Sequence, residues 1–125
     1  MGMQQDVMFP EDAAWPTWQA VCDRLAERGV EVQMRMIDGE LAMPDEAPPE
    51  RWHELRVATE GGMITLRREG RQLSVITFDN AEATLRQGWN VLAWAFAAAG
   101  AGEVVTPEAR LSANAFADAA NLPGA

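Results

Sequence analysis

The sequence predicts an α+β fold: an antiparallel meander sheet of four to five strands with helices packed on one face, in the order α-β-(β)-β-β-β-α-α. Helical periodicity at both ends of the chain encloses a run of strand-like segments. The connections between strands in residues 52–78 have two or three residues, whereas parallel strands need a crossover of a dozen or more. With 125 residues, 48% of them apolar and 23% charged, residues 1–125 are expected to form a single domain.

The first half of the chain is expected to begin with a loose segment, residues 1–12, followed by a helix at residues 16–28. A proline suits the first turn of that helix, and apolar residues recur at i, i+3, i+4 and i+7 from Trp18. Alternating apolar and polar side chains then predict a strand from residue 30 to 36. Asp38-Gly39 predicts a tight turn into a short strand.

The second half is expected to complete the sheet and add two helices. Residues 44–50, PDEAPPE, indicate an exposed loop because they combine three prolines with three acids. Strands are predicted at residues 52–59, 63–68 and 71–78. A long helix is predicted at residues 81–99, and residues 103–125 are expected to form a C-terminal tail or helix.

The long helix is apolar on two opposite faces. Its core face combines Leu85, Trp89, Leu92 and Phe96, and its outer face combines Val91, Trp94, Ala98 and Ala101. Such a helix has to be covered on both sides, either by the chain's own segment around Leu111 and Phe116, by a second copy or by a partner. We expect a two-fold homodimer with the outer face as its interface, because dimer interfaces favour aromatic residues and few charges.

The charge of the chain disfavours two classes of partner. The formal charge is −9, and residues 1–50 contribute −8 of it, with eleven acids against three arginines. A field of that sign repels nucleic acid and anionic membrane surfaces, so we expect neither as a partner. The N-terminus lacks the basic start and apolar run of a signal peptide, and Cys22 is the only cysteine. A cytoplasmic location is therefore expected.

Catalytic chemistry has little support in the sequence. His53 is the only histidine, and in a strand its neighbour Glu54 would point to the opposite face. Because His53 shares strand parity with Leu55 and Val57, we expect it at the rim of the sheet's buried face. Cys22 lies on the apolar stripe of the first helix and is expected to act as a small hydrophobic residue. The acids between Asp38 and Glu50 match no calcium loop and are expected to be solvated. No metal or cofactor is predicted.

Two further groups of side chains are candidates for binding. Arg67, Arg68 and Arg71 flank one turn and are a possible anion site, although a charged hairpin tip is the simpler interpretation. Trp15, Trp18 and Trp52 are expected in core, staple or interface roles. The sequence thus favours a non-catalytic homodimeric protein-interaction module. The alternative is a protein that binds a small molecule or an anion, either as a binding protein or as an enzyme, and that uses the sheet face with His53 and arginines.

Overall fold

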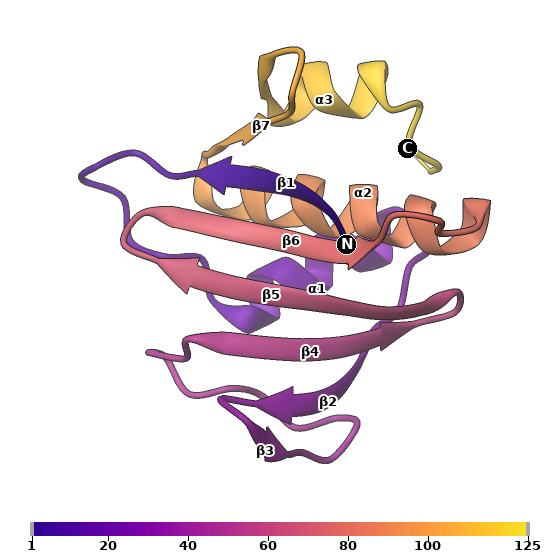
Figure 1. Cartoon of the computed structure of the whole chain (residues 1–125). Helices are drawn as coiled ribbons and strands as arrows, with labels where there is room; N and C mark the ends of the chain where they lie inside the picture. The colour runs from indigo at the N-terminus through magenta and orange to yellow at the C-terminus, as the bar shows by residue number, and fades with distance from the viewer. Residues whose placement is uncertain (1, 125) are drawn as a thin grey trace.

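The computed structural model describes residues 2–124, which form eight strands and three helices (Figure 1). In chain order these are β1 (Gly2–Met8), α1 (Trp18–Glu27), β2 (Gln33–Ile37), β3 (Glu40–Leu41), β4 (Glu54–Thr59), β5 (Gly62–Glu69), β6 (Gln72–Phe78), α2 (Ala83–Gly100), β7 (Glu103–Val105), β8 (Arg110–Ser112) and α3 (Ala113–Ala119).

All strands belong to one sheet in the order β3-β2-β4-β5-β6-β1-β7-β8, and every neighbouring pair is antiparallel. The predicted α+β class, the antiparallel pairing and the meander β4-β5-β6 are confirmed. Helices α1 and α2 lie together behind the sheet in Figure 1, and α3 packs against α2 and the β7–β8 hairpin. Within residues 2–124, no helix lies on the opposite face of the sheet.

The sheet has eight strands, so the expected four to five was wrong, and so was the loose N-terminal segment. Residues 2–8 form β1, which lies between β6 and β7. The sequence GMQQDVM does not predict a strand, because a polar residue occupies one of the inward positions and interrupts the apolar alternation. Gln5 is only 4% exposed, and its Nε2 donates a hydrogen bond of 3.1 Å to Asn90 Oδ1 on α2. This partner makes a buried amide tolerable in a central strand.

The C-terminal region also contains more structure than the expected tail or helix. Strands β7 and β8 have three residues each, too few for a period-2 pattern to be visible in the sequence. The turn between them closes through Thr106, whose backbone N–H donates to the Ala109 carbonyl at 2.8 Å. The predicted helix exists as α3, where Ser112 caps the first turn and Phe116 is buried.

The second half of helix α2 is enclosed on every side within residues 2–124, whereas Ala83, Thr84, Arg86 and Gln87 in its first half are exposed. Residues 91–97 are all buried, with Val91 at 0% and Trp94 at 4% exposure. Its second half packs closely on the segment after β1, since a Cβ added at Gly100 would lie 2.5 Å from the Phe9 ring. Although α2 is strongly apolar, no helix within residues 2–124 has the length and hydrophobicity needed to cross a membrane.

The outer face of α2 is covered by the end of α1 and by the chain's own C-terminal part. The Arg28 guanidinium lies 4.4 Å from the centre of the Trp94 ring, and Arg28 Nη1 donates to the Pro123 carbonyl at 3.2 Å. Of the four residues expected at an interface, Val91 and Trp94 are therefore inaccessible to a second chain. Ala98 is half-buried, and Ala101 is exposed at the left-handed C-cap of the helix. Self-association stays a prediction, and on this face Val91 and Trp94 offer no surface for it.

Replacing Trp94 should therefore weaken the fold itself. We expect Trp94→Ala to lower the free energy of unfolding by about 3–5 kcal/mol, because it leaves a large cavity under Arg28. Leu41→Ala is the control: Leu41 on β3 is 89% exposed, so its loss should cost less than about 1 kcal/mol. Urea denaturation followed by circular dichroism measures both values. A Trp94→Ala protein of unchanged stability and halved solution mass would contradict this packing.

Candidate functional site

Five aromatic side chains form a continuous cluster from the surface to the core. Phe9 contacts Trp15 with ring centres 4.6 Å apart, and Trp15 lies 6.3 Å from Trp52. The ring centre of Phe96 on α2 lies 6.2 Å from that of Trp52 and 6.3 Å from that of Trp18. Since Trp15 and Trp18 are half-buried and Trp52 is 5% exposed, the cluster has an accessible rim and a buried base.

Arg68 on β5 inserts its guanidinium into the outer part of this cluster. Its Cζ lies 4.0 Å from the centre of the Trp15 ring and 5.1 Å from that of Trp52, a cation–π arrangement. Its Nη1 donates a hydrogen bond of 3.0 Å to the Glu50 carbonyl. Burial lowers the pKa of Arg68, and the charge of Asp38 opposes that effect. Since arginine titrates far above neutrality, the group remains a cation.

A groove of about 710 Å³ opens above these residues. One wall is formed by residues 14–19, the other by residues 47–52 of the proline-rich loop, and Arg68 lies between them. Pro16, Pro48 and Pro49 line it together with the three tryptophans. An open depression with aromatic and proline walls and few charged groups is typical of a binding site.

Backbone contacts hold both walls in place. On one side, Thr17 caps α1 by accepting the Ala20 N–H at 3.1 Å, which fixes Trp18 as the first helical residue. On the other side, the Asp38 carboxylate accepts the backbone N–H groups of His53 at 2.7 Å and Glu54 at 2.8 Å. Because these residues directly follow Trp52, the turn at Asp38 anchors the wall that carries it.

The surroundings of the groove are acidic. Glu11 and Asp12 are exposed in the segment that precedes residues 14–19 in the chain, and Asp45, Glu46 and Glu50 are exposed on the proline-rich loop. Among the lining residues, Glu50, Arg51 and Arg68 sum to +1. With the four further acids of the two adjoining segments the sum is −3, so the field around the groove favours a cationic ligand.

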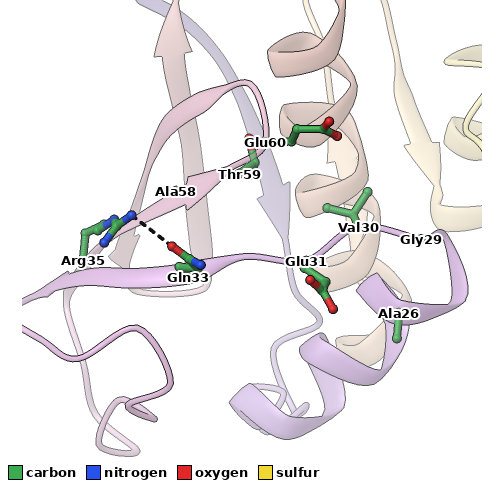
Figure 2. A pocket seen from close by; sticks show the side chains of 9 residues that line it. All are labelled: Ala26, Gly29, Val30, Glu31, Gln33, Arg35, Ala58, Thr59 and Glu60. Carbon is green, nitrogen blue, oxygen red and sulfur yellow. Dashed lines mark hydrogen bonds between the residues drawn. The ribbon is translucent and has the colours of Figure 1, made fainter.

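A second depression, of about 650 Å³, lies between the end of α1, the start of β2 and the end of β4 (Figure 2). Its walls are polar: Gln33 and Arg35 are joined by a hydrogen bond of 2.9 Å, and Glu31 and Glu60 come from separate loops. No aromatic side chain lines it. Within residues 2–124 no three His, Cys, Asp or Glu side chains gather in a metal-binding arrangement. We therefore regard the tryptophan groove as the better candidate.

The predicted anion site is not assembled as a cluster. Arg67 points to the open face of the sheet and lies 3.7 Å from Glu54, whereas Arg68 points to the opposite side, into the groove. Arg71 donates to the Phe9 carbonyl at 3.4 Å. Consecutive strand residues point to opposite faces, which separates Arg67 from Arg68. Only Arg68 joins the candidate site.

Neither His53 nor Cys22 lines one of the two depressions described above. The expected position of His53 at the rim of the sheet's buried face was wrong: the residue precedes β4, its side chain is exposed, and its backbone carbonyl accepts the Arg68 N–H at 2.8 Å. Cys22 is half-buried on α1, where burial, with a smaller effect of Asp23, raises the pKa of its thiol. A protonated thiol is a poor nucleophile.

Comparisons with known protein families, with curated proteins and with solved structures find no match for this chain. The sequence predicts roles for the three tryptophans of the groove but not their convergence. The available signal was the pairing of Trp15-Pro16 and Pro48-Pro49 near Trp52, two rigid proline segments beside large aromatic rings.

The anchoring role of Asp38 gives a pH-dependent prediction. The hydrogen bond from the Glu54 N–H, helped by that from His53, lowers the pKa of Asp38. Its stabilising effect is therefore complete above the unfolded pKa of about 3.9 and is lost as pH falls through the lower folded value. We expect Asp38→Asn to be less stable than wild type at neutral pH and the difference to shrink below about pH 4. Thermal unfolding across pH, with Asp45→Asn as control, measures this; a pH-independent difference would contradict it.

The raised pKa of Cys22 predicts slow alkylation. At neutral pH, iodoacetamide should modify the native protein more slowly than the urea-unfolded protein, because burial limits both access and thiolate formation. Mass spectrometry of timed samples gives the two rates. Equal rates in the two states would show that the thiol is open to solvent and more reactive than its surroundings imply.

Proposed function

We propose that this protein is a non-catalytic protein-interaction module that binds an extended, proline-containing, basic segment of a partner protein in the tryptophan groove. The observation that carries the proposal is the convergence of Trp15, Trp18 and Trp52 with three prolines along one open depression. Aromatic grooves of this kind suit polyproline II segments, whose preformed conformation lowers the entropy lost on binding.

The electrostatics support a basic segment. The acids on both sides of the groove attract arginine or lysine side chains that flank a proline core, and the chain's charge of −9 speeds the approach of a cationic partner. The anchored walls support the same function, because a groove held by Thr17 and Asp38 needs little reordering when it binds.

A second candidate function is the binding of a small planar carboxylate. Arg68 supports it: the one hydrogen bond described for its side chain goes to the Glu50 carbonyl, and a guanidinium carries five N–H donors. An aromatic acid would place its ring on Trp15 and its carboxylate on the remaining donors. The acidic rim opposes any anion, so we rank this candidate second.

Fluorescence anisotropy with labelled peptides tests the proposal. A peptide of Arg-Pro-Pro repeats should bind, and peptides of Glu-Pro-Pro and Arg-Gly-Ser repeats should bind at least about tenfold more weakly, through charge repulsion and loss of the proline surface respectively. Trp15→Ala and Trp18→Ala should each weaken binding by about 30-fold, the usual effect of removing an aromatic hot spot. Leu41→Ala, which removes an exposed apolar side chain outside the groove, is the control and should leave the affinity unchanged.

Two outcomes would contradict the peptide function. Equal affinity for the Arg-Pro-Pro and Arg-Gly-Ser peptides would show that the protein recognises only the positive charge of the peptide and not its prolines. Binding of indole-3-carboxylate that is lost in Arg68→Ala, without binding of any peptide, would favour the second candidate.

A further inference from the structure

The open face of the sheet is apolar at one end. Ala58 pairs with Met63 across β4 and β5. Continuing the β5–β6 register by two residues beyond the Thr65–Ile76 pair brings Met63 opposite Phe78 on β6. Phe78 is 61% exposed and Met63 is 37% exposed. We call Ala58, Met63, Thr65, Ile76 and Phe78 the Met63–Phe78 patch. All five belong to the face opposite the buried side chains of the same strands.

The other end of this face is ionic, and its charges are largely matched within the chain. Glu54 lies 3.8 Å from Arg56 and 3.7 Å from Arg67, and Glu103 lies 2.8 Å from Arg110. On the open face, the six neighbouring strands β4, β5, β6, β1, β7 and β8 carry four acidic side chains and three arginines. This face therefore sums to −1 in a chain of charge −9, and the acidity lies elsewhere.

From this distribution we infer that a second copy of the chain docks on the Met63–Phe78 patch, forming a two-fold dimer in which two sheets pack face to face. Two molecules of this charge repel each other over most of their surfaces, and the nearly neutral face lets them approach at the smallest electrostatic cost. A two-fold axis brings the same patch to itself, so apolar side chains meet apolar side chains.

The geometry of the patch suits such a contact. An axis between β5 and β6 places Phe78 of one copy near Met63 of the other, a favourable thioether–aromatic contact. Sheets packed in this way lie about 10 Å apart with strands about 30° from parallel. The ion pairs at the other end of the face remain at the rim, where interfaces are polar.

Other occupants fit less well. Helices α1 and α2 cover the opposite face and α3 lies on α2, β7 and β8, so no segment within residues 2–124 covers the patch. Anionic lipid and nucleic acid are repelled by the acids outside this face. A basic protein is drawn toward the acidic loops around the groove rather than toward a neutral surface.

Sedimentation velocity over a range of micromolar concentrations tests the dimer. Wild type should shift from monomer toward dimer as concentration rises, and Phe78→Glu and Met63→Glu should each raise the dissociation constant at least about tenfold, because a charge is buried without a partner. Met43→Glu is the matched control: Met43 is 66% exposed in the loop after β3, outside the patch, and its replacement should leave the dissociation constant unchanged.

Circular dichroism and melting temperature establish that each variant is folded. If one of the two patch variants, Phe78→Glu and Met63→Glu, does not fold, the other is used to test the dimer. A wild type that remains monomeric at high micromolar concentration would overturn the inference. So would a dimer that both patch variants leave intact, or one that Met43→Glu weakens as much as they do. Trp15→Ala should leave the dimer unchanged, which separates this surface from the groove.

Discussion

The second half of helix α2 is apolar all round and requires cover on every side, and the arrangement of the other elements follows from that requirement. No charged residue occurs between Arg86 and Glu103, and every residue from 91 to 97 is buried. The sheet covers one side of the helix, α1 another, and α3 with the following segment covers the rest. A helix that is apolar all round has no stable position at a surface, so the chain returns over it after β7 and β8.

The same requirement shapes the groove. Phe96 on α2 is the buried base on which Trp18 and Trp52 lie, and these in turn support Trp15 and Arg68. Large rigid rings lose little conformational entropy when a ligand covers them. The groove is therefore an outward extension of the core, and its rigidity comes from the packing of α2 as much as from the loops that carry its walls.

Sequence reasoning found the elements whose pattern reflects local burial and missed those that depend on distant partners. The helices near residues 16–28 and 81–99 and the meander of β4, β5 and β6 were predictable because their periodicity is strong. Strand β1 was missed because Gln5 is buried through a bond to Asn90, 85 residues away. The same limit applies to the site: Trp15 and Arg68 are 53 positions apart in the chain, and no local pattern places one on the other. The apolar outer face of α2 was recognised, but which segment covers it depends on the path of the C-terminal residues.

The two proposed surfaces lie on opposite faces of the sheet and at opposite ends of its central strands. Arg68 approaches the groove from the end of β5, on the helix side, whereas Met63 lies at the start of β5 on the open face. A dimer formed through the Met63–Phe78 patch would therefore leave both grooves accessible and directed away from the interface. Two grooves held in one assembly bind a partner with repeated segments more tightly than one groove does, provided that the connection between the segments spans the distance. For such a partner, the affinity of each groove can be modest and the complex can still be long-lived.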